Sequence, residues 1–424
     1  MKVASLIAAA VLVISGSAAL AAEQPGTGNY LPPEDMIIHI LDTHPMVLEA
    51  EAKLNAAEAD ARRMRAGEHE FVLEGEYVRR DVGAGEIVGR GNYNEWNIGV
   101  SRAIRLPAKA RADRTTGQLG VDVAEYARDD ARHQTALLFK DQWLDWLEAT
   151  ALLRIDEAEA ETYRQELAAV QRRLDLKGAS QLDLEQAKVA LATAESSVTE
   201  SRRASDAAAL ALQHTFPELV LPHEAPSLPD PQALQGDVLA WRKMVIDHSH
   251  ELAMAEKDAE RAMSAAHRAS LDRVADPTIG FRTFQERGGD ETGIGVSVSI
   301  PLGFARRRAI SDTMRAEAVA ASVREQSMRR EIALVADRDI TNMTATVNAW
   351  KQAASARAAS DDVVGRMRRA VELGDRDFSE LLLTLRQHFE VQRSEERERA
   401  AAHRALLQFQ IDAHQIWGLH HEDT

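Results

Sequence analysis

Histidines that lie close together in the sequence are the side chains best placed to bind a metal ion. His420 and His421 adjoin each other, and His248 and His250 flank Ser249. Imidazole is a common ligand for zinc and similar cations, but ligand spacing without a geometry fixed by the fold is weak evidence. We therefore predict no metal site from these residues.

Paired carboxylates are the other side chains that could take part in catalysis. The pairs Asp129-Asp130 and Asp361-Asp362 fall in tracts expected to be helical, where acidic pairs usually form solvated faces and not acid–base dyads. The sequence has no cysteine, no glycine-rich phosphate loop, no Gly-x-Ser-x-Gly elbow and no His-Glu-x-x-His motif. These features predict a protein that is not an enzyme and carries no cofactor.

Charge and the first residues of the sequence indicate the compartment. The formal net charge of -16 argues against nucleic acid as a partner. Lys2 precedes an apolar run over residues 6–14, and the small residues Ala19 and Ala21 follow it. This is the pattern of a signal peptide, and the apolar run is too short for a membrane span. We predict that residues 1–22 are removed on export.

The positions of the prolines divide the rest of the chain. Proline breaks helix interiors, so the proline-free tracts 108–216 and 302–424 are free to form long helices. Pro107 and Pro301 stand at the expected starts, where proline is tolerated. Small and apolar residues recur every three or four positions in these tracts, which predicts coiled-coil packing. The predicted seam residues are Leu184, Ala187, Leu191, Ala194, Val198, Ser201, Ser205, Ala208 and Leu212, and later Ala336, Ile340, Met343, Val347 and Trp350.

Two halves of the chain share matching segments at one sequence offset. Residues 98–101 and 294–297 both read Ile-Gly-Val-Ser, and Gly178 and Gly374 are also 196 residues apart (374 − 178). Several matches at one offset indicate a duplicated unit. Each unit is expected to contain a helix, two strands joined by a loop, a long helix, a turn and a final helix. The predicted boundaries are 23–215 for the first repeat, 216–232 for a proline-rich linker, 233–418 for the second repeat and 419–424 for a polar tail.

Alternating residues predict four β-strands, at 71–78, 96–104, 277–284 and 293–300, with loops at 81–94 and 285–292. Apolar residues alternating with small or polar ones over about ten positions are typical of a membrane β-barrel strand, whose apolar side chains face lipid. Ordinary half-buried hairpins are the alternative. A barrel needs about eight strands, so several copies of this chain would have to share one. The predicted lipid-facing residues are Ile294, Val296, Val298 and Ile300.

Each long helix is predicted to end at a glycine and to turn back into the next helix. Gly178 and Gly374 are expected to take the left-handed conformation that commonly ends a helix. Ser180 and Asp377 follow at positions from which a side chain could cap the next helix.

The order of these elements, the duplication and the two turns resemble the TolC-like outer membrane factors. The resemblance covers nearly all of the chain after residue 22. It implies a mostly α fold with a four-strand membrane β contribution: long coiled-coil helical hairpins that form a periplasmic α-barrel, and part of a trimeric β-barrel. It also implies a homotrimer in the cell outer membrane, contacting outer-membrane lipid, that serves as the passive conduit of a tripartite efflux system. The implied partners are a periplasmic adaptor protein and an inner-membrane efflux pump.

The same resemblance assigns roles to residues of this chain. Residues 104–111 resemble the strand-to-helix junction of the cobalt–zinc–cadmium efflux branch, with Ala108 where that branch has glycine, which implies heavy-metal cations as cargo. Val371 stands where the family often has a tyrosine, which implies a looser closed state. The positions that match the adaptor-docking tips are Arg172, Leu176, Gly178, Arg368, Leu373 and Gly374, and those that match the gate are Asp183, Arg376 and Glu380.

The helical tracts by themselves also fit a protein of another class, a secreted and soluble coiled-coil scaffold or interaction protein. Both classes share the long helices, so the four strands decide between them. A wide water-filled conduit need not select its cargo, so the sequence does not identify a transported substrate.

Overall fold

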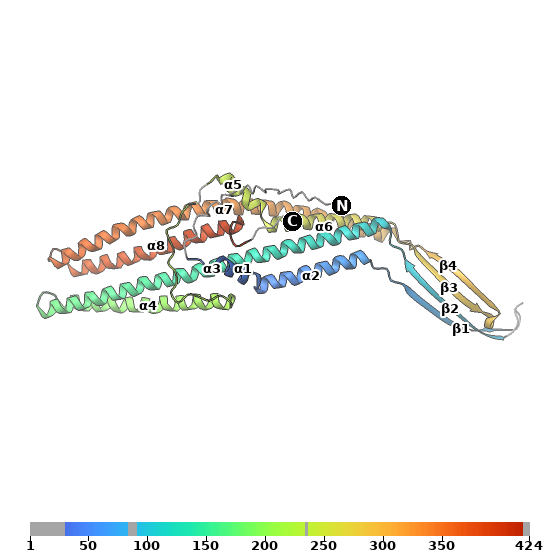
Figure 1. Cartoon of the computed structure of the whole chain (residues 1–424), viewed down its shortest axis with the longest axis horizontal. Helices are drawn as coiled ribbons and strands as arrows, with labels where there is room; N and C mark the ends of the chain where they lie inside the picture. The colour runs from blue at the N-terminus through green and yellow to red at the C-terminus, as the bar shows by residue number, and fades with distance from the viewer. Residues whose placement is uncertain (1–29, 84–90, 234–235, 419–424) are drawn as a thin grey trace, which may run out of the picture.

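The computed structural model describes residues 30–83, 91–233 and 236–418 and shows an elongated molecule (Figure 1). Strands form one end of it, and helices continue from them to two helical hairpins at the other end. The predicted signal peptide and the predicted tail at 419–424 lie outside the described residues. Within the described ranges, no helix is both long enough and apolar enough to cross a membrane.

The two longest helices extend over most of the helical part of the molecule. α3 (Pro107–Asp175) and α7 (Phe304–Glu372) each contain 69 residues, which is about 104 Å at 1.5 Å per residue. Both were expected from the proline-free tracts. Pro107 is the first residue of α3, as predicted, whereas Pro301 precedes α7 by three residues because Gly303 is the residue that flanks the helix start.

Shorter helices pack along the long ones in two sets. The second arm of each hairpin contains 35 residues, and the helix that leads into each strand pair contains 22. The hairpin arms are α4 (Gln181–Thr215) and α8 (Phe378–Asp412), the leading helices are α2 (Pro45–Ala66) and α6 (His250–Leu271), and two short helices are α1 (Glu34–Asp42) and α5 (Val238–Asp247).

Two helices precede each strand pair, where the sequence predicted one. Pro45 begins α2, and the Nδ1 atom of His44 accepts a hydrogen bond from the Met46 N–H at 3.3 Å. In the second half Ser249 caps the start of α6 in the same way, because its Oγ accepts a bond from the Leu252 N–H at 3.2 Å. These caps satisfy N–H groups that a continuous helix would have bonded internally, and so they divide each expected helix.

The order helix, helix, strand, strand, helix, helix occurs twice in the described chain. The starts of α3 and α7 are 197 residues apart (304 − 107), one more than the offset of the strands. The difference arises because three residues separate Ile300 from α7, whereas two separate Ile104 from α3. We infer that the two units arose by duplication and that one residue was gained or lost at this junction.

The strands form one antiparallel sheet in the order β1-β2-β3-β4. The predicted strands were too short at their loop ends. Backbone pairing extends to the cross-strand pairs Val82–Gly91 and Glu286–Glu291, beyond the point where apolar and polar side chains stop alternating. The predicted loops 81–94 and 285–292 were therefore too wide, and residues 84–90 lie outside the described ones. The strands are β1 (Val72–Val82), β2 (Gly91–Ala103), β3 (Thr278–Glu286) and β4 (Glu291–Ser299), with a short 3-10 helix η1 (Arg287–Gly289) between the last two.

The buried core follows the helices in separate clusters. The predicted seam of α7, from Ala336 to Trp350, is buried against α5 and α8, and every predicted seam residue of α4 is buried or half-buried. The proline-rich linker is held at the middle of the molecule, where Phe216 packs edge-on against Phe139 of α3 with ring centroids 5.4 Å apart. The linker is thus part of the packed structure.

Candidate functional site

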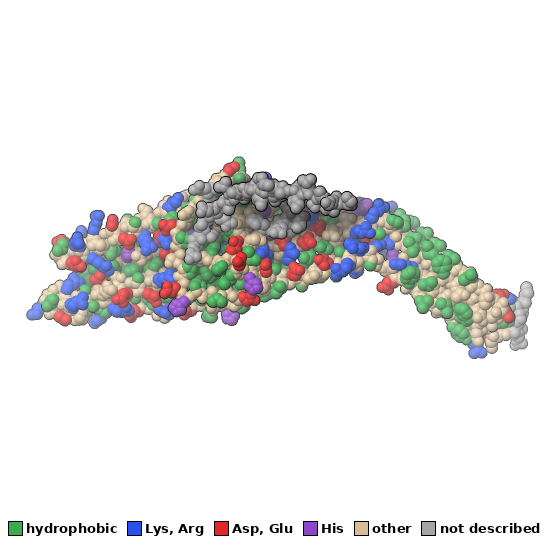
Figure 2. Space-filling view, in the orientation of Figure 1, with side chains coloured by type: hydrophobic (Ala, Val, Ile, Leu, Met, Phe, Trp, Pro, Cys, Tyr) green, Lys and Arg blue, Asp and Glu red, His purple; other side chains and the backbone are tan. Residues whose placement is uncertain are grey.

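The sheet has one face made of apolar side chains, and that face is exposed. Residues directly opposite each other in an antiparallel sheet point to the same face. The pairing therefore aligns Leu73, Val100, Phe281 and Val296 in one row across all four strands. Their exposed fractions are 78%, 40%, 60% and 68%, the reverse of the burial expected in a sheet that covers a core. The predicted lipid-facing residues Ile294, Val298 and Ile300 lie exposed along the same edge, and Figure 2 shows hydrophobic side chains gathered over the strands.

The opposite face of the sheet carries most of its polar side chains, together with glycines and serines that are most frequent on β4. One row across it reads Val72, Ser101, Gly280 and Ser297. A Cβ atom added at Gly280 would approach the Ser297 Oγ to 2.6 Å, so a side chain at this position would have to displace its neighbour. Farther along, the Asn97 amide donates to a Glu76 carboxylate oxygen at 2.6 Å. This face suits contact with water, and its small side chains leave space in front of it.

Both outer edges of the sheet lack a neighbouring strand within the described chain. β1 pairs only with β2, and β4 pairs only with β3. An exposed edge presents unpaired backbone N–H and C=O groups that favour pairing with another strand. The sheet is therefore open on both sides and can continue into other copies.

The turns at the far ends of α3 and α7 share one backbone design. In the first, the Gly178 N–H bonds the Arg173 carbonyl at 2.7 Å, and in the second the Asp375 N–H bonds the Ala370 carbonyl at 2.9 Å. This six-residue bond closes a helix end in the Schellman manner and places the residue before the donor in the left-handed region. That residue is Gly374 in the second turn, at φ 80°, but Lys177 in the first, at φ 61°.

The prediction that Gly178 takes the left-handed conformation was therefore wrong. The two helix ends are 197 residues apart, whereas the two glycines are 196 apart, so Gly178 matches Asp375 and Lys177 matches Gly374. The glycines match in sequence but not in structure, because the second repeat has one extra residue at the strand-to-helix junction.

The strained Lys177 gives a testable difference between the two tips. A left-handed backbone conformation costs a non-glycine residue roughly 1–2 kcal/mol. Glycine avoids this cost but loses more backbone entropy on folding, so the net gain from a glycine is smaller. We expect Lys177→Gly to raise the free energy of unfolding by up to about 1 kcal/mol and Gly374→Val to lower it by about 2 kcal/mol. Denaturant titration of the two variants measures both. Gly178→Val is the matched control, since its φ is not positive, and an equal loss at Gly178 and Gly374 would contradict this assignment.

Comparison with known proteins identifies the fold. No family model and no curated protein matches the sequence. Among solved structures, a membrane protein from Pseudomonas aeruginosa has a TM-score of 0.78 at 14% identity, with 93% of each chain covered. The outer membrane protein VceC from Vibrio cholerae has a TM-score of 0.73 at 15% identity, covering 90% of this chain and 95% of its own. The Campylobacter jejuni CmeC outer membrane channel has a TM-score of 0.67 at 11% identity, covering 91% and 85%. The chain has the TolC-like fold. The expected mostly α fold, with long helical hairpins and a four-strand sheet, is thereby confirmed.

The predicted docking residues at the two tips differ in how exposed they are. Leu176 and Leu373 flank the ends of α3 and α7 at matching positions, with exposed fractions of 83% and 71%. Arg172 is also exposed. Arg368, by contrast, is half-buried, and its Nε lies 3.3 Å from a Glu166 carboxylate oxygen of the other hairpin. Arg368 therefore joins the two hairpins, whereas the two leucines are free to contact a partner.

In the described chain, each predicted gate residue contacts a residue of its own tip. Arg376 pairs with Glu380 of the same tip at 3.2 Å, and both side chains are exposed. Asp183 accepts the Ser180 N–H at 2.8 Å, and the Ser180 Oγ accepts the Asp183 N–H at 3.1 Å, which is a complete capping box at the start of α4. The expected cap at Ser180 is confirmed. Asp377 flanks the start of α8 but makes no capping bond with its side chain.

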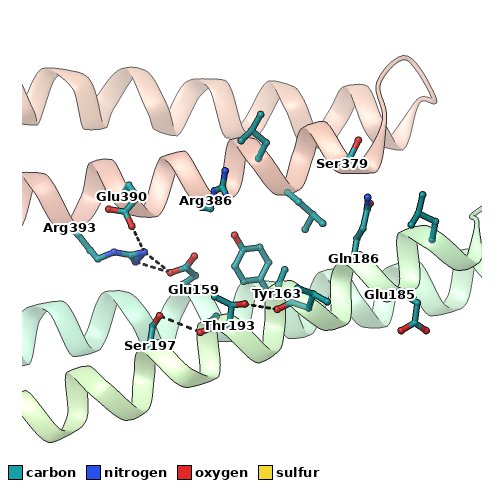
Figure 3. A pocket seen from close by; sticks show the side chains of 16 residues that line it. Glu159, Tyr163, Glu185, Gln186, Thr193, Ser197, Ser379, Arg386, Glu390 and Arg393 are labelled. Carbon is teal, nitrogen blue, oxygen red and sulfur yellow. Dashed lines mark hydrogen bonds and ion pairs between the residues drawn. The ribbon is translucent and has the colours of Figure 1, made fainter.

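A groove between the hairpins lies close to both tips (Figure 3). Arg393 of α8 crosses toward α3, where its guanidinium lies 2.8 Å from Glu159 and 3.0 Å from Asp156. Burial raises the pKa of Glu159, and the Arg393 charge opposes that rise. Leu182 and Leu383 line the groove from α4 and α8, and both are exposed. The groove therefore combines exposed apolar side chains with a charged cross-link.

Sequence reasoning missed an ionic network where the sheet meets the helices. Lys109, the third residue of α3, is 2% exposed, and its Nζ lies 3.0 Å from both Asp272 and Asp276. Asp276 also accepts the Leu106 N–H at 3.2 Å and contacts the His69 Nε2 at 3.0 Å. Burial opposes ionisation of Asp276, but the His69 and Lys109 bonds hold its pKa below the usual value. His69 and Asp276 are 207 positions apart, and Lys109 lies between them in the sequence, so spacing gave no signal.

Proposed function

We propose that this chain is one subunit of a trimeric outer-membrane channel that serves as the passive conduit of an efflux system. The observation that carries the proposal is the exposed apolar face of a four-strand sheet in the TolC-like fold. β1 has 11 residues, which span about 36 Å at ~3.3 Å per residue. A tilt of roughly 40° shortens this to about 28 Å, close to the hydrocarbon thickness of a bilayer. In a membrane, lipid chains would cover the apolar face of the sheet that no part of the described chain covers.

The open edges favour a barrel shared among copies. One sheet supplies four strands, too few for a closed barrel, whereas three copies supply twelve (3 × 4). Pairing of β1 with β4 of the next copy would satisfy the unpaired backbone groups of both edges. The small residues of the polar face, such as Gly280 and Ser297, would then line a water-filled lumen.

The other partners follow from the opposite end of the molecule. The helices would continue the barrel as a periplasmic tunnel, and the exposed Leu176 and Leu373 with the groove between the hairpins would receive a periplasmic adaptor protein. The adaptor would connect the channel to an inner-membrane pump. We extend the proposal to heavy-metal cations as cargo only on the resemblance of the junction at residues 104–111.

Channel activity tests the proposal directly. The detergent-purified protein, added to a planar lipid bilayer, should produce discrete conductance steps that report single channels. A protein that adds no conductance and stays soluble without detergent would instead support the soluble scaffold. The experiment thus separates the two classes of protein that share the long helices.

The gate prediction is tested by the same recording. Arg376→Glu would place a second negative charge four residues before Glu380 and remove a cation from the tips, which would meet around one axis in the proposed trimer. We expect a larger single-channel conductance, with the difference reduced at high salt because salt screens exposed charges. Asp183 can join such links while it caps α4, since a carboxylate accepts several bonds. Arg203→Glu is the matched control, an exposed pair with Glu200 on α4. Equal conductance of the native and Arg376→Glu channels at low salt would place the constriction elsewhere.

A further inference from the structure

Three potential ligands from distant parts of the chain meet where the two repeats touch at the middle of the molecule. Asp130 and His133 lie one helical turn apart on α3, and Glu251 belongs to the first turn of α6. One ligand atom of each residue lies within 4.8 Å of those of the other two. His133 is buried, and the two carboxylates are half-buried. These residues are 121 positions apart (251 − 130), so the fold and not the sequence brings them together.

His133 is oriented as a metal-binding histidine would be. Its Nε2 lies 2.9 Å from the Asp412 carboxylate, and Asp412 is itself held by the Gln408 amide at 2.8 Å. The other ring nitrogen, Nδ1, is buried and has no hydrogen-bond partner, in a residue that is 6% exposed. A carboxylate that accepts the N–H of one ring nitrogen and leaves the other nitrogen as a lone-pair donor is the usual outer partner of a ligating histidine. An unpaired buried nitrogen is costly, which a bound cation would relieve.

Among the described residues, the carboxylates of Asp130 and Glu251 contact an amide side chain and not a positively charged one. The Gln134 amide spans them with long bonds, 3.3 Å to Asp130 and 3.4 Å to Glu251. Within the described part of the chain neither carboxylate forms an ion pair with a lysine or arginine. The two arginines that flank them on α3 are paired elsewhere, Arg128 with Asp129 and Arg132 with Asp42, each at 2.7 Å. Two neighbouring carboxylates therefore lie beside His133, and neither is paired with a lysine or arginine of the described chain.

We propose that Asp130, His133 and Glu251 bind one divalent transition-metal cation of the zinc class, which ties α3 of the first repeat to α6 of the second. One imidazole nitrogen and two carboxylate oxygens suit zinc, which binds both ligand types at about 2.1 Å. In a tetrahedron of that size the ligands stand about 3.4 Å apart, so ligand atoms that now lie up to 4.8 Å apart need to approach by up to about 1.4 Å. Water would fill the fourth position. This site was not predicted from the sequence, and it does not depend on the proposed channel function.

Direct metal binding to the full-length protein tests the site. All proteins carry His420→Ala and His421→Ala, so that the adjacent histidines cannot contribute, and are stripped with a chelator before dialysis. We expect calorimetric titration with Zn²⁺ to show one saturable site per chain. Co²⁺ should give the visible absorption bands of a tetrahedral site and should be displaced by Zn²⁺.

Conservative variants decide whether these residues are the ligands. Glu251→Gln and Asp130→Asn, on different helices, should each weaken Zn²⁺ binding at least tenfold while circular dichroism and elution volume stay unchanged. Asp412→Asn should weaken it about 10–100-fold, as expected when the outer partner of a ligating histidine is lost. The control is Asp361→Asn, which alters another carboxylate near a histidine, 3.6 Å from His388, and should leave affinity unchanged. Equal affinity of the native protein and both ligand variants, or no saturable binding by the native protein, would overturn the proposal.

Discussion

Replacing Lys109 with methionine is expected to lower the free energy of unfolding by about 3 kcal/mol. Removing one partner of a buried ion pair typically costs about 3–5 kcal/mol, because the remaining charge stays buried without compensation. The lower value applies here because Asp272 is 43% exposed and therefore hydrated, whereas Asp276 is only 11% exposed. Methionine keeps the length of the lysine stem, so the loss reports the charge and not a cavity.

Chemical denaturation of the detergent-solubilised protein measures this loss. The matched control is Lys188→Met, which removes an exposed lysine 2.9 Å from Glu185 and should leave stability almost unchanged. Adding Asp276→Asn to Lys109→Met should recover part of the loss, since asparagine still accepts the Leu106 N–H without a buried charge. A Lys109→Met protein as stable as the Lys188→Met protein would show that the junction does not depend on this pair.

Val296→Arg should reduce assembly in the outer membrane. The free energy of the assembled state should rise by about 2–4 kcal/mol if the residue lies near the bilayer midplane. Val296 is 68% exposed on the apolar face, in one row with Phe281 of the adjacent strand. An arginine there would have to leave water for hydrocarbon, or bend back along the strand toward the interface. The oligomer that survives in detergent extracts of the outer membrane, resolved on native gels, reports assembly.

The adjacent residue provides the control for Val296→Arg. Ser297 lies on the polar face, because successive residues of a strand point to opposite sides. Ser297→Arg should therefore assemble far better, with its charge in the lumen. If both variants assemble equally, the apolar face does not contact lipid.

Patterns that repeat along one element could be read from the sequence. The absence of proline over two long tracts was enough to predict α3 and α7, because a single proline would have broken either helix. The alternation of Ile294, Val296 and Val298 with glycine and serine correctly placed them on one exposed face. The pattern could not predict the loop ends of the strands. Backbone pairing of β1 and β2 extends to the pair Val82–Gly91, where side chains no longer alternate.

Features that depend on distant residues could not be predicted. Lys109 reads as a surface lysine near the start of a helix, and only the fold brings Asp272 and Asp276 to it. His250 was considered only as a neighbour of His248, whereas the structure buries it beside His414 with ring centroids 4.5 Å apart. The assignment at Gly178 failed for a related reason, because a one-residue difference more than seventy residues earlier changed which position matches Gly374.

The mass of the native assembly decides whether this chain forms a trimeric channel. Because each chain supplies four strands and two open edges, a closed barrel requires several copies, and the proposal requires three. Native mass spectrometry of protein extracted from outer membranes with detergent should give three times the mass of the processed chain. A single-chain mass, from a protein that remains monodisperse without detergent, would show that the chain does not share a barrel with other copies.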